Sequence, residues 1–217
     1  MCGINGISWT DARLVDEMNT MLLHRGPDDA GIFSDERATL GNRRLAILDL
    51  PGGRQPMRRG NLVMTFNGEV YNHIEIREEL KTKGQVFDTR SDTEVILAAF
   101  AQWGSASVSK FNGMWAFCIY DSDKGAFFIS RDRYGIKPVY YRQDAEGRLV
   151  FSSEIKPILH TGVPRRVNEQ MMRDYLFYGY TDLSSETFFE GVNRLAPTQN
   201  LHYDVQSRTL SFSRIEP

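Results

Sequence analysis

The second residue of the chain is a cysteine, and a terminal cysteine can carry a nucleophile and a base on one residue. A small side chain at position 2 allows aminopeptidase to remove Met1, which would leave Cys2 with a free α-amine. Because an α-amine has a pKa of about 7.7–8.0, its neutral fraction can take the thiol proton directly or through one water. A lone cysteine is often incidental, but the segment Gly3 to Ile7 is apolar and strand-like, which is uncommon for a frayed terminus. Cys2 is therefore a candidate nucleophile.

The other residues that could do chemistry give weaker signals. Cys118 lies in an apolar run and is interpreted as a small buried hydrophobe, with both thiols free in a reducing compartment. The four histidines are scattered and none has metal-ligand spacing with a cysteine or acid cluster, so no metal is expected. Gly52-Gly53 lacks the spacing and the Lys-Ser/Thr of a phosphate-binding loop.

Size and charge limit the classes of protein to consider. The 217 residues, 41% of them hydrophobic, are enough for a sizeable core in one large or two small domains. A net charge of -2 with interspersed signs predicts no nucleic-acid partner and no membrane surface. No apolar run reaches the roughly 20 residues of a membrane helix, and the N-terminus lacks the basic start of a signal peptide. The expected location is the cytoplasm.

Hydrophobic periodicity predicts alternating strands and helices in the first half. A strand at 3–8 precedes a helix with Leu14, Met18, Met21 and Leu22 on one face, ended by Gly26-Pro27. Strands are expected at 31–35, 37–42 and 61–66. A helix with Asn72 as candidate N-cap runs to Gly84, and another opens with Ser91 and Glu94 in capping-box spacing and stops at Gly104.

The second half is rich in expected strands. Hairpins are predicted at 114–120 with 126–130, at 138–143 with 148–153, and at 199–204 with 209–212, and a helix at 169–178. Consecutive hairpins imply antiparallel sheets, and amphipathic helices imply layers that cover them. The pattern alone gives an α+β class without a topology, and no linker divides the chain.

Nine local sequences, taken in order, resemble one family. They are Met1–Ile4, His24–Asp28, Arg43–Leu50, Gly53–Met57, Phe66–Asn72, Ser91–Leu97, Phe111–Phe117, Arg131–Pro138 and Ser152–Lys156. Together they look like the class II glutamine amidotransferase (glutaminase) domain of glutamine-dependent asparagine synthetases, over essentially residues 2–204. The resemblance implies a four-layer αββα N-terminal-nucleophile hydrolase sandwich that fills residues 1–217, with the ATP-binding synthetase domain absent from this chain.

The same resemblance implies roles for residues at the matching positions. Cys2 would attack glutamine, and the side-chain amide of Asn67 with the N–H of Gly68 would form the oxyanion hole that acyl transfer needs. Without the family match, Asn67-Gly68 reads as a plain turn. The block around Asp132 is interpreted as a structural loop beside the active site.

Substrate binding is implied for a second set of residues. Arg44 would grip the glutamine α-carboxylate with its guanidinium fork, and Asp92 and Glu69 would receive the α-ammonium. Backbone groups of Leu45, Ala46, Ile47 and Leu48 would line the same pocket. The plain alternatives are a surface arginine, a helix N-cap at Asp92 and a solvated acid at Glu69.

The implied reaction is hydrolysis of L-glutamine to glutamate and ammonia through a cysteine thioester. The ammonia would serve ATP-dependent asparagine synthesis in a synthetase domain or subunit outside this chain. No cofactor is expected for the glutaminase reaction, while ATP and Mg²⁺ would act in the synthetase domain. Two alternatives remain open: delivery of ammonia to an acceptor other than aspartate, and a catalytically silent glutamine-sensing module.

Overall fold

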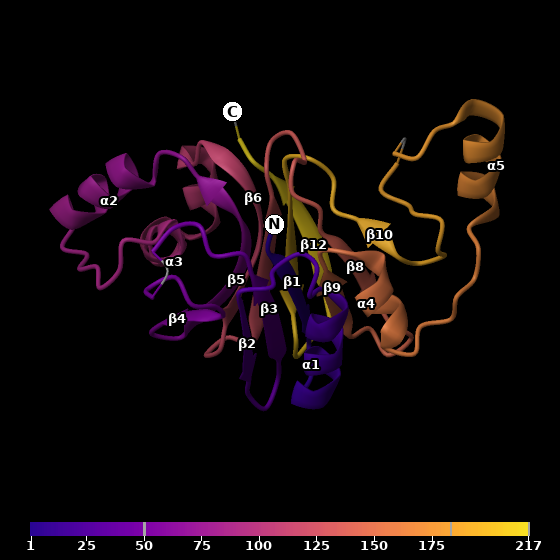
Figure 1. The fold of residues 1–217 in the computed structure, drawn as a ribbon, viewed down its shortest axis with the longest axis horizontal. Helices are drawn as coiled ribbons and strands as arrows, with labels where there is room; N and C mark the ends of the chain where they lie inside the picture. The colour runs from indigo at the N-terminus through magenta and orange to yellow at the C-terminus, as the bar shows by residue number, and fades with distance from the viewer. Residues whose placement is uncertain (50, 183, 217) are drawn as a thin grey trace.

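Two antiparallel sheets lie face to face at the centre of the computed structural model, which describes residues 1–49, 51–182 and 184–216 (Figure 1). The β1 sheet has the strand order β10-β8-β9-β1-β3-β2, and the β5 sheet has the order β12-β11-β7-β6-β5-β4. The β1 sheet consists of β1 (Gly3–Ile7), β2 (Asp29–Ser34), β3 (Thr39–Arg44), β8 (Tyr140–Gln143), β9 (Leu149–Ser152) and β10 (Asn193–Arg194). The β5 sheet consists of β4 (Met57–Arg59), β5 (Leu62–Val70), β6 (Gly113–Asp121), β7 (Ala126–Arg131), β11 (Gln199–Asp204) and β12 (Leu210–Arg214).

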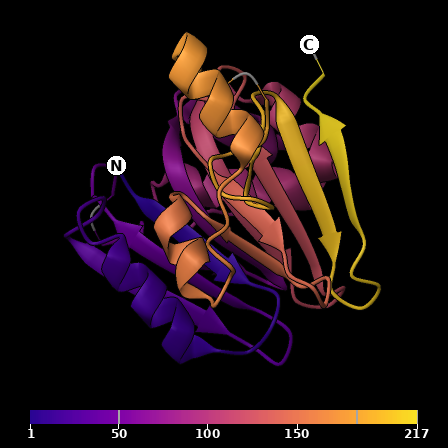
Figure 2. The same ribbon diagram turned by 90° about the vertical axis from the view of Figure 1, so that its right-hand side faces the viewer.

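Helices cover the outer faces of both sheets. Helices α1 (Ala12–Met21) and α4 (Ile155–His160) pack on the β1 sheet and on each other, as Figure 2 shows. Helix α3 (Asp92–Trp103) packs on β4 and β5, with α2 (His73–Thr82) and the 3₁₀ helix η1 (Gly104–Lys110) against it. Helix α5 (Glu169–Tyr178) projects from the opposite end of the molecule from α2 (Figure 1). The expected four-layer αββα sandwich is confirmed.

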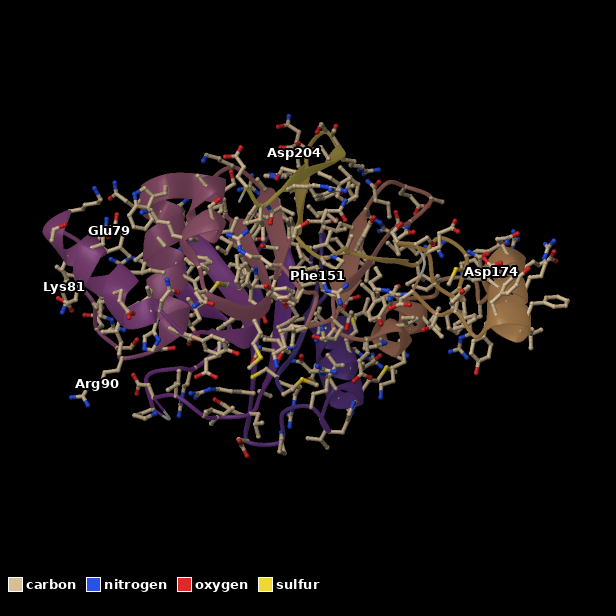
Figure 3. The ribbon with its side chains drawn as sticks, turned by 90° about the horizontal axis from the view of Figure 1, so that it is seen from above. Glu79, Lys81, Arg90, Phe151, Asp174 and Asp204 are labelled. Carbon is tan, nitrogen blue, oxygen red and sulfur yellow. The ribbon has the colours of Figure 1, made fainter. Side chains whose placement is uncertain are left out.

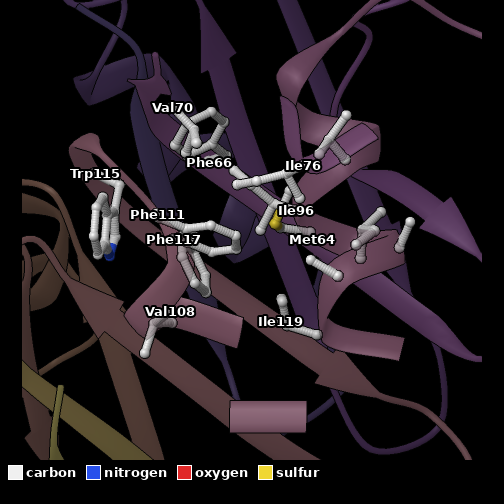
Figure 4. Packing of buried hydrophobic residues seen from close by; sticks show 14 of the residues in the cluster. Met64, Phe66, Val70, Ile76, Ile96, Val108, Phe111, Trp115, Phe117 and Ile119 are labelled. Atoms are coloured by element: carbon white, nitrogen blue, oxygen red, sulfur yellow. The ribbon is translucent and has the colours of Figure 1, made fainter. Parts of the chain in front are cut away.

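Three apolar clusters fill the spaces between the layers. The cluster between the two sheets includes Ile4, Leu40, Phe127 and Phe151, and Phe151 lies near the middle of the molecule when it is seen from above (Figure 3). The cluster between the β5 sheet and α3 is the largest, and Figure 4 shows its side chains from Met64, Phe66, Ile96, Trp115 and Phe117. The third cluster lies under α1 and α4 and includes Ile7, Val15, Met18 and Ile158.

Strand β1 is buried along its whole length because both faces of it are covered: Ile4 packs in the cluster between the two sheets, and Ile7 packs in the cluster under α1 and α4. Its edges are antiparallel to β3 on one side and to β9 on the other. Ser153, just past β9, donates its backbone N–H to Ile4 O at 2.8 Å and accepts the Ile4 N–H on Oγ at 3.0 Å. Cys2, directly ahead of this strand, therefore has a fixed starting point in the fold.

Several expected elements are confirmed and others differ in extent. The hairpins of β6 with β7, β8 with β9 and β11 with β12 form as predicted, and α5 has the predicted bounds. Strand β2 begins two residues earlier than expected, and strand β3 begins two residues later than expected. Strand β5 is longer than 61–66 because nine residues of β6 pair with it, from Leu62↔Asp121 to Val70↔Gly113. Asn67-Gly68 is therefore strand, and the turn interpretation is wrong.

The two helix starts are built differently from the predicted caps. Ser91 does cap α3, accepting the Thr93 N–H on Oγ at 3.1 Å, but Glu94 does not complete a capping box. Its carboxylate accepts the backbone N–H groups of Asp88 and Thr89 at 2.9 and 2.8 Å and so holds the loop before the helix.

Asn72 stands at the start of α2, but its side chain makes no cap bond. It donates to Lys110 O at 2.9 Å and accepts the Asn112 N–H at 2.9 Å, which ties the helix start to the segment before β6. In α1 the buried face holds Val15 and Met18, whereas Leu14 and Met21 are only half-buried.

Candidate active site

A pocket opens where the head of β1, the end of β3, the second half of β5 and the start of α3 meet. Its walls include most of the residues expected to form the site, namely Cys2, Arg44, Leu45, Ile47, Leu48, Asn67, Gly68, Glu69 and Asp92. Ala46 is not among the lining residues, and its N–H donates to Asp28 Oδ2 at 2.8 Å. The fold thus brings together residues that are up to 90 positions apart, which sequence spacing could not show.

The sulfur of Cys2 is held against the backbone of Leu45. Leu45 N lies 3.4 Å from Sγ and Leu45 O lies 3.6 Å from it. Burial raises the pKa of the Cys2 thiol above its usual value, and the contact with Leu45 and the charge of Arg44 act in the opposite direction. The carbonyl of Cys2 accepts the Arg25 Nε–H at 3.0 Å, and Arg25 is fixed in turn by Glu154 at 3.2 Å. Met1 precedes Cys2 in the structure and also lines the pocket.

Strand β5 presents an open edge to the pocket, because β4 ends beside Met64. Both backbone groups of Trp115 bond to Asp132 on the other side of β6, so Trp115 and its partner Gly68 form a non-hydrogen-bonded pair. The N–H of Gly68 therefore points away from β6, toward the open edge. A Cβ at position 68 would lie 2.2 Å from Met114 O, so only glycine fits this close approach.

The side chain of Asn67 projects from the opposite face of β5, toward the β1 sheet. It is 1% exposed, and its Nδ2 has no hydrogen-bond partner within the described residues, although nearly all such buried groups are paired. An unpaired buried donor that lines the same pocket as the Cys2 sulfur is suited to donate a hydrogen bond to a developing negative charge.

Arg44 holds the loop that follows it, whose residues Leu45, Ile47 and Leu48 line the pocket. Its Nη2 donates to Leu48 O at 3.0 Å and to Asp49 O at 2.9 Å, and the side chain is buried. The Asp49 carboxylate accepts the N–H groups of Arg90 and Gly52, and these bonds lower the pKa of Asp49. The guanidinium is thus held in one place by the loop it supports.

Asp92 and Glu69 are the two acidic residues among those that line the pocket with this arginine. Asp92 is the first residue of α3, where the helix dipole favours an anion, and its Oδ2 accepts the Val70 N–H at 3.1 Å. Burial nevertheless raises the pKa of Asp92 above its usual value, against the lowering effect of that hydrogen bond. One arginine and two acids thus line the same pocket.

Sequence reasoning missed several residues that line the pocket. They are Met1, Gly53, Gln55, Phe66, Ser91, Thr93, Met114 and Lys137. Gln55, Met114 and Lys137 lie inside the local sequences that carried the family resemblance, but nothing in those sequences indicated that they line the pocket. The loop around Asp132 is structural, as expected: its buried carboxylate accepts the N–H groups of Tyr134, Ile136 and Lys137.

Stacked antiparallel sheets between helices, with a cysteine at the head of a central strand, define the N-terminal-nucleophile hydrolase class of fold. A solved structure with the same arrangement is glutamine phosphoribosylpyrophosphate amidotransferase of Bacillus subtilis, with a TM-score of 0.72 and 19% identity. The match covers 99% of this chain and 49% of that one. The chain belongs to the family of glutamine amidotransferase domains, whose family model matches residues 1–213.

Two curated relatives are similar to this chain over most of its length. A putative glutamine-hydrolysing asparagine synthetase 2 of Methanocaldococcus jannaschii is 37% identical, over 97% of this chain and 45% of the relative. The glutamine-hydrolysing asparagine synthetase B of Escherichia coli is also 37% identical, over 82% of this chain and 33% of the relative. The chain therefore spans less than half of the length of these relatives.

Two further observations concern the rest of the described chain. None of its helices is both long enough and apolar enough to cross a membrane. Three or more His, Cys, Asp or Glu side chains do not gather as a metal-binding group anywhere in residues 1–49, 51–182 and 184–216. The cytoplasmic location stays a prediction.

Proposed function

We propose that the chain hydrolyses L-glutamine to glutamate and ammonia, with Cys2 as the nucleophile and its own α-amine as the base. One juxtaposition supports this proposal above all others. A single pocket is lined by the Cys2 sulfur, by the Nδ2 of Asn67, which has no partner among the described residues, and by the open edge of β5 at Gly68. These are a nucleophile and two donors, the set that acyl transfer from an amide requires.

The substrate would be oriented by charge. Arg44 would pair with the α-carboxylate of glutamine, and Asp92 with Glu69 would receive the α-ammonium, while Leu45, Ile47 and Leu48 would pack along the side chain. These contacts hold the end of glutamine that does not react. The γ-carboxamide would then point toward Cys2 with its oxygen near Asn67 and Gly68.

The reaction would proceed by two acyl transfers. The neutral α-amine of Cys2 takes the thiol proton, and the sulfur attacks the γ-carbonyl carbon to give an oxyanion held by Asn67 Nδ2 and Gly68 N–H. When the intermediate collapses, the ammonium returns its proton to the leaving nitrogen, so ammonia departs and a γ-glutamyl thioester remains. Water then attacks the thioester, the amine takes a proton from it, and the thiol and glutamate are released.

This mechanism requires removal of Met1. With Met1 in place, the nitrogen of Cys2 is a peptide amide, which cannot act as a base. Met1 is 54% exposed at the pocket, so an aminopeptidase can reach it. No metal or cofactor takes part in these steps.

A direct test measures glutamate and ammonia released from L-glutamine by protein whose first residue is Cys2. We expect the two products in equal amounts, and none from a folded Cys2→Ala variant. Binding of glutamine measured by calorimetry without any turnover would contradict the proposal and would favour a glutamine-sensing module instead.

We further propose that the ammonia serves ATP-dependent asparagine synthesis in a synthetase domain or subunit, where ATP and Mg²⁺ would act. The names of the relatives support this acceptor over a non-aspartate one. The chain alone, given glutamine, aspartate, ATP and Mg²⁺, should then release ammonia and form no asparagine. Asparagine formed by the pure chain would contradict this division of labour.

A further inference from the structure

The open edge of β5 carries three N–H groups in a row, at alternate residues, that point away from β6. The N–H of Phe66 is taken by Gln55 Oε1 at 2.6 Å, and the N–H of Val70 is taken by Asp92 Oδ2 at 3.1 Å. The Gly68 N–H lies between these two bonds. Two side chains from outside the sheet therefore bracket the donor that is proposed to bind the oxyanion.

Gln55 stands where β4 would have continued. Strand β4 reaches β5 only as far as Met57↔Met64, so the side-chain carbonyl of Gln55 replaces the backbone acceptor that a longer β4 would have supplied to Phe66. A longer β4 would also have consumed the Gly68 N–H. Because the Gln55 side chain takes the place of a longer β4, the Phe66 N–H keeps an acceptor and the Gly68 N–H stays open to the pocket. Gln55 also lines this pocket.

Gln55 is itself fixed from two directions. Its Oε1 also accepts from Asn42 Nδ2 on β3 at 3.2 Å, and Asn42 Nδ2 contacts Thr65 Oγ1 at 3.1 Å. Its backbone lies so close to β2 that a Cβ at Gly31 would be 1.9 Å from Gln55 O. Contacts with β2 and β3 of the other sheet thus determine where the acceptor for Phe66 lies.

We propose that Gln55 is a positioning residue for the oxyanion hole: its Oε1 holds the Phe66 N–H and thereby aims Asn67 and Gly68 at the reacting carbonyl. The inference rests on the proposed glutaminase function. Because Gln55 acts on the donors and not on the charged groups of the substrate, its loss weakens the transition state more than the bound glutamine. A donor displaced by about 1 Å costs on the order of 10²-fold in rate.

The variants for the test differ in one property each. Gln55→Met keeps the length of the side chain and removes the acceptor, while Gln55→Glu keeps an acceptor at the same place. Thr65→Val is the matched control, because it disturbs the same buried network through Asn42 and leaves the Phe66 bond intact. We expect Gln55→Met to lose at least tenfold in kcat with KM changed less than threefold. Gln55→Glu should recover most of that loss, and Thr65→Val should lower Tm with kcat retained.

A second measurement does not depend on turnover. Amide hydrogen exchange followed by NMR should show the Phe66 N–H protected in the wild type and in Gln55→Glu, and exchanging faster in Gln55→Met. Equal protection in all three would overturn the inference, as would a Gln55→Met enzyme with wild-type kcat. An inactive wild type with the expected exchange pattern would instead contradict the glutaminase proposal and leave the hydrogen-bond assignment standing.

Discussion

The sulfur of Cys2 lies 3.4 Å from the backbone N of Leu45 and 3.6 Å from its carbonyl oxygen. The nucleophile and the loop that would hold the substrate are therefore in direct contact before any ligand arrives. Leu45 follows Arg44, whose guanidinium supports the same loop through Leu48 O. If the loop moves when the substrate binds, the surroundings of the Cys2 sulfur change directly with it.

Any residue in front of Cys2 should abolish glutaminase activity, because the proposed base is the α-amine of Cys2. A fusion with a protease site directly before Cys2 makes the comparison within one preparation. We expect no turnover before cleavage and full turnover afterwards, with intact-mass spectrometry confirming the new terminus. Full activity in protein that retains Met1 would refute the proposed base.

A glutamine-mimicking electrophile such as 6-diazo-5-oxo-L-norleucine should label Cys2 and spare Cys118. Cys118 is fully buried inside β6, and burial raises the pKa of its thiol well above the usual value, so its thiolate is scarce. Peptide mapping after labelling checks the site. Cys118→Ala serves as the control and should be labelled to the same extent as the wild type; adducts on Cys118 would reverse the assignment.

Asn67→Ala should reduce kcat by about 10²–10³ with a smaller change in KM, because an oxyanion donor acts in the transition state. The same variant should unfold at or above the wild-type temperature, since it removes a buried donor that has no partner within the described chain. Steady-state kinetics and thermal denaturation together test this. A large drop in Tm would show that Asn67 is structural.

Arg44→Ala should raise KM for glutamine by about 10–100-fold, the loss expected for a charge-assisted hydrogen bond, with a smaller effect on kcat. The α-carboxylate is remote from the scissile bond and is held alike in the ground and transition states. Arg44→Lys keeps the charge and loses the bidentate guanidinium, so its KM should lie between those of the wild type and Arg44→Ala. Unchanged KM in Arg44→Ala would move the carboxylate contact to another residue.

Asp92→Asn should bind glutamine poorly and yet be at least as stable as the wild type at pH 7. Asparagine can still accept the Val70 N–H, so the lost property is the charge. Because burial raises the pKa of Asp92 in the fold, ionisation costs stability as pH rises through that pKa, and this cost is missing below the unfolded value of about 3.9. The stability advantage of the variant should therefore shrink as pH falls toward 4, measured by Tm against pH.

Ser91→Ala is the matched control for Asp92, because Ser91 and not Asp92 supplies the capping hydroxyl of α3. Its loss should cost about 0.5–2 kcal/mol of stability and leave KM near the wild-type value. If Asp92→Asn binds glutamine normally, Asp92 serves the strand alone, and Glu69 becomes the residue for the ammonium.

The elements with a strong local pattern could be predicted from the sequence, and several of the shortest ones could not. Helix α3 and the paired strands β6 and β7 carry strong apolar patterns over many residues. Strand β4 has three residues, β10 has two, and α4 has six that include Pro157. Such segments owe their conformation to the neighbours they pair or pack with, which a local pattern does not contain.

The candidate site divides in the same way. The residue types at positions 2, 44, 67, 68 and 92 suggested chemistry, with family resemblance supplying their roles. Their convergence depends on the stacking of β1 and β3 over β5, and no spacing in the sequence encodes that. Gln55 could not be predicted for a further reason. Its proposed role depends on where β4 ends, and strand pairing alone determines that.

The two hydrogen bonds between Ile4 and Ser153 also bear on how the protein folds. The two residues are 149 positions apart, and β9 beside them is among the last strands of its sheet to leave the ribosome. Pairing of β1 on both of its edges therefore requires more than two thirds of the chain, although β3 already pairs with it along its whole length. Contacts of such long range favour slow folding, so we expect the pairing of β1 with β9 to form late.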